Sequence, residues 1–282
     1  MFNFSAKMKK FLSIILSLIF LLFSSNVDAR KKRHHHRSVP KKQIHVVYRM
    51  PVAPRIVDGI CGIDVSHYQG YIDWDRVSCY ENNPIKFVYV KATEGSTIKD
   101  DYYQRNISLA KGKGLLVGSY HYFTSKSTAE EQFENFKQTA EKERQDLIPV
   151  VDIEECKYWT PDIFHKNLQV FLNEIEAYYG KKPVIYTFSA FYNSYLIDRY
   201  KDYKIFIAQY GDGNPELKDG NNWHIWQFTR KGRIEGIHGN VDVNAINPGC
   251  DHNEILLNSK PTINESVEKK ELVPNPVPVP VS

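Results

Sequence analysis

Short apolar segments alternate with segments of helical periodicity through the middle of this chain, and this alternation restricts its fold most strongly. The apolar segments have the length of β-strands and stand at residues 60–65, 86–92, 115–123, 147–153 and 183–187. The segments that follow each of them are predicted to be helices and stand at residues 72–80, 102–112, 128–144, 161–179 and 190–198. Repeated strand–helix units favour a parallel sheet, open or closed, with helices on the outside.

The pattern changes toward the C-terminus. Residues 204–209, 224–228 and 241–244 are predicted to be strands, but the loops between them show no convincing helix. Without its two ends the chain keeps about 200 residues, 59–258, fewer than the roughly 250 of a typical β/α barrel. We therefore predict an α/β fold, an irregular TIM-like β/α barrel whose last strands lack full helices.

Both ends of the chain are predicted to lie outside this barrel domain. Residues 1–29 have the pattern of a secretory signal peptide, with lysines before an apolar stretch at 11–23 and a Val-Asp-Ala cleavage site. The apolar stretch is shorter than the roughly 20 residues of a spanning helix, so we expect no membrane span. Residues 30–58 are predicted to be a basic, disordered leader, and residues 259–282 a polar, proline-rich tail. The sequence thus predicts a secreted or periplasmic protein.

Charge is distributed unevenly along the chain. The leader holds nine lysines and arginines against the single acid Asp58, whereas the chain beyond it has a net negative charge. We therefore expect no nucleic-acid binding by the folded part. The leader could hold the protein near an anionic envelope by electrostatic attraction, or it could be a solvated linker without a partner.

Four cysteines, Cys61, Cys79, Cys156 and Cys250, follow the predicted signal peptide. Export permits disulfides, and four cysteines allow three pairings. We favour Cys61 with Cys79, because the start of a strand and the end of the next helix lie at the same end of a strand–helix unit. The spacing of the four cysteines fits no zinc-site pattern, so we expect no metal.

Asp152 and Glu154 end an apolar run that is predicted to be a buried strand. Successive strand side chains point to opposite faces, so both carboxylates emerge on one side and Ile153 on the other. Such acids are costly to bury unless they are paired or protonated; the alternative is a strand end that reaches solvent. Two more predicted strands carry acids, Asp64 and Asp242. If the four carboxylates converge in one cleft, at least one pKa must rise, as a general acid requires.

Short motifs follow one another through nearly the whole folded part. They are Gly62-Ile-Asp-Val-Ser-His-Tyr-Gln-Gly70, Phe87-Val-Tyr-Val-Lys-Ala-Thr-Glu-Gly95, Gly118-Ser-Tyr-His-Tyr-Phe123, Val151-Asp-Ile-Glu154, Pro183-Val-Ile-Tyr186, Trp226-Gln-Phe228 and Val241-Asp-Val-Asn244. In this order they resemble the family-25 glycoside hydrolases, the Chalaropsis-type lysozymes or muramidases. The resemblance implies an irregular β/α barrel that acts on peptidoglycan glycan strands. It would hydrolyse the β-1,4 bond between N-acetylmuramic acid and N-acetylglucosamine without a cofactor.

The resemblance also implies roles for the four acids. Glu154 matches the general acid and Asp152 the second catalytic carboxylate, while Asp64 and Asp242 match the other acids of the active site. Retention of all four argues against an inactive enzyme.

Candidates for substrate binding come from two sources. The resemblance suggests Tyr186 and Gln227. The residues themselves add Lys91 and Gln69, which lie near strand ends, and two aromatic side chains on one strand face, Tyr120 and Tyr122. Aromatic side chains suit sugar rings because they offer an apolar face together with a hydroxyl group.

The stereochemistry and the function both have alternatives at this stage. The backbones of residues i and i+2 on one strand lie about 6.6 Å apart. This distance falls between the separations of the two catalytic carboxyl groups that are typical of retention (about 5–5.5 Å) and of inversion (about 6.5–9.5 Å). The residues therefore leave retention, inversion and attack by the substrate's own acetamido group open, while the resemblance favours net retention. The alternative functions are a chitinase-like hydrolase of N-acetylglucosamine polymers and a glycan-binding module without turnover.

Overall fold

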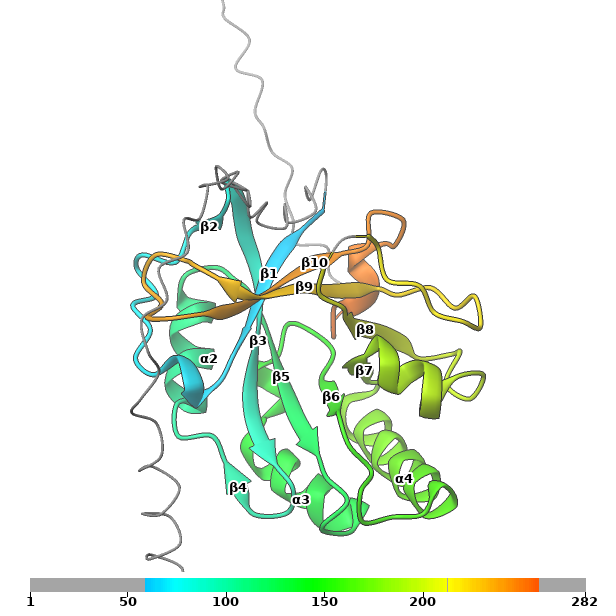
Figure 1. The fold of residues 1–282 in the computed structure, drawn as a ribbon. Coiled ribbons are helices and arrows are strands. Elements are labelled where there is room, and N and C mark those ends of the chain that lie inside the picture. The colour runs from blue at the N-terminus through cyan, green and yellow to red at the C-terminus, as the bar shows by residue number, and fades with distance from the viewer. Residues whose placement is uncertain (1–58, 212, 259–282) are drawn as a thin grey trace, which may run out of the picture. The chain divides into compact units, whose positions relative to one another are not determined.

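Eight strands close into a barrel in the part of the chain that the structure, a computed structural model, describes: residues 59–211 and 213–258 (Figure 1). The strands are β1 (Cys61–Val65), β3 (Asn83–Glu94), β5 (Leu116–Phe123), β6 (Val150–Ile153), β7 (Val184–Phe188), β8 (Lys204–Ala208), β9 (Ile225–Gly232) and β10 (Val241–Ile246). Their order around the ring is β1-β10-β9-β8-β7-β6-β5-β3, and pairing of β1 with β3 closes it. The predicted barrel is confirmed.

One strand of the ring runs against the others. Strands β1, β3, β5, β6, β7, β8 and β9 pair in parallel, whereas β10 is antiparallel to both β9 and β1. The beginning of β10 therefore lies at the barrel end where the parallel strands finish. This places Asp242 directly opposite Asp64 of β1.

Three helices cover the outside of the barrel between the earlier strands: α2 (Tyr103–Gly112), α3 (Ala129–Thr139) and α4 (Pro161–Tyr179) (Figure 1). Helix α4 has the predicted bounds, because the Thr160 side chain caps its first turn and Gly180 ends it in the left-handed conformation at φ 82°. Helix α3 is shorter than predicted; a separate 3₁₀ turn, η2 (Lys142–Arg144), follows it.

The connections that follow β7 contain little helix, as predicted. After β7 there is only α5 (Ser189–Phe191), which runs into a π-helical turn, η3 (Tyr192–Leu196). Among the described residues no helix joins β8 to β9 or β9 to β10. A last 3₁₀ turn, η4 (His252–Ile255), follows β10.

The helix predicted at residues 72–80 is wrong. After β1 the chain forms a 3₁₀ turn, η1 (His67–Gln69), and then irregular turns leading to the two-residue strand β2 (Cys79–Tyr80), which pairs with β3. Tertiary hydrogen bonds replace helical ones here: the Asp73 N–H donates to the Gly236 carbonyl at 2.8 Å. Another two-residue strand, β4 (Ile98–Lys99), pairs with the far end of β3.

The apolar side chains form two layers, one inside the barrel and one between the barrel and its helices. Strand β6 contributes to both: Val150 packs with the interior cluster, and Val151 and Ile153 pack with the outer one. This alternation confirms that Ile153 faces away from the side to which Asp152 points.

The four cysteines are free thiols, so the favoured Cys61–Cys79 disulfide is not present. Both residues lie beside the start of β3, but Cys61 is buried in β1 whereas Cys79 is exposed. Burial raises the pKa of the Cys61 thiol to about 12. Within residues 59–211 and 213–258, no cluster of histidine, cysteine and acidic side chains could hold a metal ion.

The predicted signal peptide, the basic leader and the proline-rich tail lie outside the described residues. Within the described ones, no helix is both long and apolar enough to cross a membrane.

Gly118 leaves room for an aromatic side chain inside the barrel. A Cβ atom at this position would lie 2.4 Å from Cε1 of Tyr89 and 2.9 Å from Cβ of Leu147. Both neighbours are fully buried, so neither can move aside freely.

We expect Gly118→Ala to lower the free energy of unfolding by about 1–3 kcal/mol, the usual cost of overpacking a core. Denaturant unfolding measures this. Gly112→Ala is the matched control, because nothing lies within 4 Å of a Cβ there and alanine is the better helix former. Equal stability of the two variants would contradict the proposed tight packing.

Candidate active site

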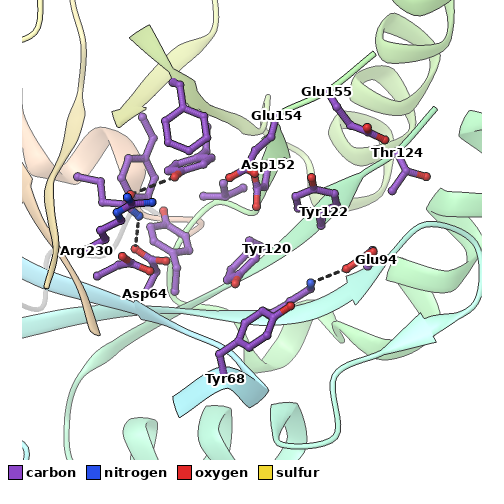
Figure 2. Close-up of a pocket in the computed structure, with 18 of the residues that line it drawn as sticks. Asp64, Tyr68, Glu94, Tyr120, Tyr122, Thr124, Asp152, Glu154, Glu155 and Arg230 are labelled. Atoms are coloured by element: carbon purple, nitrogen blue, oxygen red, sulfur yellow. Dashed lines mark hydrogen bonds and ion pairs between the residues drawn. The ribbon is translucent and has the colours of Figure 1, made fainter. Parts of the chain in front are cut away.

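A cavity of about 530 Å³ opens at the barrel end where the parallel strands finish. Six acids line it: Asp64, Glu94, Asp152, Glu154, Glu155 and Asp242. Aromatic side chains also line it: Tyr68, Tyr89, Tyr120, Tyr122, Tyr186, Phe188, Phe206 and Tyr210. Figure 2 shows Asp152 and Glu154 between the Asp64 side of this cavity and the side that carries Thr124 and Glu155. The four acids selected from the sequence thus meet in one place.

Asp64 and Asp242 face each other across the β1–β10 pair. Side chains directly opposite in antiparallel strands have Cβ atoms about 4.5–5.5 Å apart, and like charges there repel. Burial, followed by the charge of Asp64, raises the pKa of Asp242 to about 8. Burial also raises the pKa of Asp64, but hydrogen bonds from Asn244 and Gln227 oppose this rise.

Asp64 is held by a hydrogen-bond network that reaches two tyrosines. The side-chain amides of Gln227 and Asn244 each donate to Oδ2 of Asp64 at 2.9 Å. The hydroxyl of Tyr186 donates to Oε1 of Gln227 at 3.0 Å, and the Tyr210 hydroxyl donates to the same oxygen. Two amide donors favour the ionised form, so Asp64 is the best placed of the four acids to carry a negative charge.

Asp152 and Glu154 differ in their surroundings. Asp152 is 8% exposed, and its buried Oδ1 has no hydrogen-bond partner among the described residues. Burial, then the charges of Glu154 and Asp64, raise its pKa well above the usual value. Burial and the charge of Asp64 likewise raise the pKa of Glu154, while Lys91 and a hydrogen bond with Tyr122 lower it. These acids cannot all ionise together.

Lys91 brings a buried positive charge into the site. It is 6% exposed, its Nζ lies 2.7 Å from Oε2 of Glu94, and it sits 5.2 Å from the ring centre of Tyr122. Its charge lowers the pKa of Asp152 and of Glu154, although burial outweighs this effect in both. Lys91 therefore partly balances the carboxylates.

The structure places most of the other candidates at the cavity too. Tyr120, Tyr122, Tyr186 and Gln227 line it. Gln69 does not: its side chain accepts from the Ser66 backbone N–H at 2.9 Å and donates to the Asn240 carbonyl, so it caps η1 instead.

Several lining residues were not identified from the sequence. Tyr68 is 81% exposed, and Tyr210 lies in the loop after β8. Arg230 lies in a part of β9 that extends beyond the predicted strand. The sequence does place Tyr68 within a motif and Arg230 in a basic pair soon after Phe228. Neither pattern shows whether these side chains point into the cavity.

A β/α barrel that gathers acids in an aromatic-lined cavity at the carboxyl ends of its strands is the arrangement of a carboxylate-dependent glycoside hydrolase. Comparison with known proteins identifies the family. Residues 63–237 match the sequence profile of glycosyl hydrolases family 25, so the chain belongs to this family. The matched segment ends before Asp242, which reaches the site through β10.

Individual relatives agree with this assignment. The uncharacterized protein YegX of Escherichia coli O6:H1 is 38% identical over 80% of this chain and 81% of its own length. Lysozyme M1 of Streptomyces globisporus is 29% identical over 70% of each chain. The structure of a family 25 glycosyl hydrolase from Bacillus anthracis superposes with a TM-score of 0.62 at 30% identity, covering 79% of this chain and 97% of that one.

The raised pKa of Asp242 predicts how stability depends on pH. A carboxyl with a pKa of about 8 when folded and about 4 when unfolded binds more protons in the folded state between these values. Its contribution to stability is present below pH 4 and is lost as the pH rises toward 8. Asp242→Asn stays neutral throughout, so its thermal midpoint should rise relative to the wild type from pH 4 to pH 8.

The exposed acid Asp202 provides the control for this measurement. A hydrogen bond from Lys182 lowers its pKa, so its contribution is complete above about pH 4. The difference between Asp202→Asn and wild type should therefore stay constant from pH 4 to pH 8. The same constancy in Asp242→Asn would contradict the raised pKa.

Proposed function

We propose that this protein is a peptidoglycan muramidase, a lysozyme that hydrolyses the β-1,4 bond between N-acetylmuramic acid and N-acetylglucosamine. One observation carries the proposal: Asp64, Asp152, Glu154 and Asp242 converge on one cavity in a family 25 barrel. Relatives named lysozyme M1 of Streptomyces globisporus and autolytic lysozyme of Clostridium acetobutylicum support this substrate.

Glu154 is the general acid in this proposal. It follows the end of β6, is partly exposed to the cavity, and has a pKa raised by burial and by Asp64. A raised pKa keeps the carboxyl protonated closer to neutral pH, so that it can protonate the leaving glycosidic oxygen. Its position beyond Asp152 and its extra methylene group help it to reach an oxygen outside the sugar ring.

Asp152 positions the nucleophile, which we propose to be the substrate's own acetamido oxygen. Its Oδ1 is buried beside the cavity without a donor, so it can accept a hydrogen bond from the acetamido N–H. Asp64, whose two amide donors favour its ionised form, stabilises the positive charge that develops on the sugar. Attack by the neighbouring group followed by water gives net retention.

We also propose that the protein acts outside the cytoplasm. Its substrate lies there, and residues 1–29 have the pattern of an export signal. In the same proposal the basic leader at 30–58 contacts the anionic envelope, an interaction that added salt should weaken.

Digestion of purified peptidoglycan tests the function. Borohydride reduction and mass spectrometry of the soluble fragments should give reduced muramic acid at the new ends. Glu154→Gln should lower the rate by about 10²–10⁴, the usual contribution of a general acid. Glu155→Gln is the neighbouring control and should cost far less, because Lys157 already engages Glu155 at 3.2 Å.

Other outcomes would point elsewhere. Reduced glucosamine at the new ends would indicate a glucosaminidase, and cleavage of chitin with intact peptidoglycan would indicate a chitinase-like enzyme. Binding without any release by the folded protein would indicate a glycan-binding module. Near-normal turnover by Glu154→Gln would remove the assignment of the acid.

The stereochemistry is tested by NMR during the first turnovers of a soluble glycan. Net retention predicts that the β-anomer of the new reducing end appears first and then mutarotates. Early appearance of the α-anomer would exclude the acetamido mechanism and require a water molecule activated directly by a carboxylate.

A further inference from the structure

Arg230 is a cation at the active-site cavity, and the described part of the chain gives it no acidic partner. It is exposed and lines the cavity on the side of Asp64 (Figure 2). Among the described residues no carboxylate lies within ion-pair distance of its guanidinium, whereas Lys91 is paired with Glu94. Its guanidinium carbon lies 5.5 Å from the ring centre of Tyr210.

An irregularity in β9 turns Arg230 toward the cavity. Gln227 faces inward and contacts Asp64, so strict alternation would bring residues 229 and 231 inward next. However, the β9–β10 register shifts. Gln227 pairs with Asn244, whereas Thr229 pairs with Val243, so two steps along β9 correspond to one step along β10. This is a β-bulge, and bulges beside active sites redirect side chains.

The result is that two neighbouring cations have different environments. Arg230 lines the cavity, whereas Lys231 does not. The Lys231 backbone N–H donates to the Thr229 hydroxyl at 3.1 Å, a local contact that supports the bulge. The charge of Arg230 also lowers the pKa of Asp242, which places the guanidinium within electrostatic reach of that acid.

Charge poses a problem for substrate binding at this site. Six acids line the cavity, and the proposed substrate is itself acidic. Every muramic acid residue carries a lactyl arm that ends either in a carboxylate or in a peptide that contains carboxylates. Those of the lining acids that are ionised repel these groups, and a guanidinium is the side chain best suited to pair with a carboxylate.

We propose that Arg230 binds a carboxylate on the lactyl arm of muramic acid, either the lactate's own or one in the attached peptide. The assignment rests on the proposed muramidase function. The exposed position of Arg230 at the cavity suits a group that projects away from the sugar ring, because the less exposed catalytic acids occupy the part where the ring must react. The adjacent Tyr210 ring holds the guanidinium without neutralising it.

The test uses two pairs of substrates, and the two members of each pair differ in the charge of their carboxyl groups. The first is soluble, uncrosslinked glycan strands with their peptides, and the second is the same strands after carbodiimide amidation of the carboxyl groups. The third is strands from which an amidase has removed the peptides, leaving lactate carboxylates, and the fourth is their amidated form. For each enzyme the measured quantity is the ratio of kcat/KM on the anionic strand to that on its amidated form.

We expect Arg230→Gln to lower this ratio about three- to tenfold relative to the wild type, in at least one of the two pairs. The pair that changes identifies the carboxylate: the peptide's for intact strands, the lactate's for stripped strands. Arg230→Lys should keep part of the preference, and added salt should weaken it in the wild type. Lys231→Gln, which removes the neighbouring charge outside the cavity, should leave the ratio as in the wild type.

The ratio separates this role from an indirect one. If Arg230 acted only by tuning Asp242, Arg230→Gln would shift the pH profile on both members of a pair equally, and the ratio would not change. An unchanged ratio in both pairs would therefore overturn the assignment while leaving the muramidase function intact. Absence of cleavage of all four substrates by the wild type would instead overturn the proposed function, and the assignment with it.

Discussion

The pairing of β1 with β3 on one side and with β10 on the other is the constraint on which the rest of the structure depends. The first pairing closes the barrel, and the second inserts a strand that runs against its neighbours. Because β10 is antiparallel, its first residues meet the last residues of β1, so Asp242 faces Asp64. A parallel strand would carry its early residues to the opposite end of the barrel. The irregular part of the fold therefore supplies one of the four acids, and it does so without a crossover helix.

The fold can hold these acids close together because each of them has a different environment. Asp64 accepts hydrogen bonds from two amide groups, whereas Oδ1 of Asp152 has no hydrogen-bond partner among the described residues. Burial and the charge of Asp64 raise the pKa of Asp242 to about 8. Lys91 adds one buried positive charge. The acids are thereby separated into one favoured as an anion and others held protonated to higher pH. Such a separation is what acid catalysis beside a charge-stabilising carboxylate requires.

Sequence patterns predicted the features that depend on local chemistry. Alternation in the run that ends at Glu154 predicted the face of Asp152, and helical periodicity predicted the bounds of α4, which Thr160 and Gly180 cap in the structure. The patterns failed where distant residues decide the outcome. Residues 72–80 follow tertiary hydrogen bonds rather than helical ones, and Gln69 is used as a cap. Arg230 depends on a register shift against β10, which no local pattern reports.

The cavity consequently has two parts with different origins. Asp64, Asp152 and Asp242 stand on strands whose register is set by neighbouring strands, and Glu154 directly follows β6, so the positions of these acids are tied to the closure of the barrel. Tyr210 and Arg230 stand on a loop and at a bulge, where a change of one residue redirects side chains without moving the acids. Recognition of groups attached to the sugar can therefore change separately from catalysis. In this chain the loop and the bulge present the Arg230 guanidinium to a substrate that carries carboxylates.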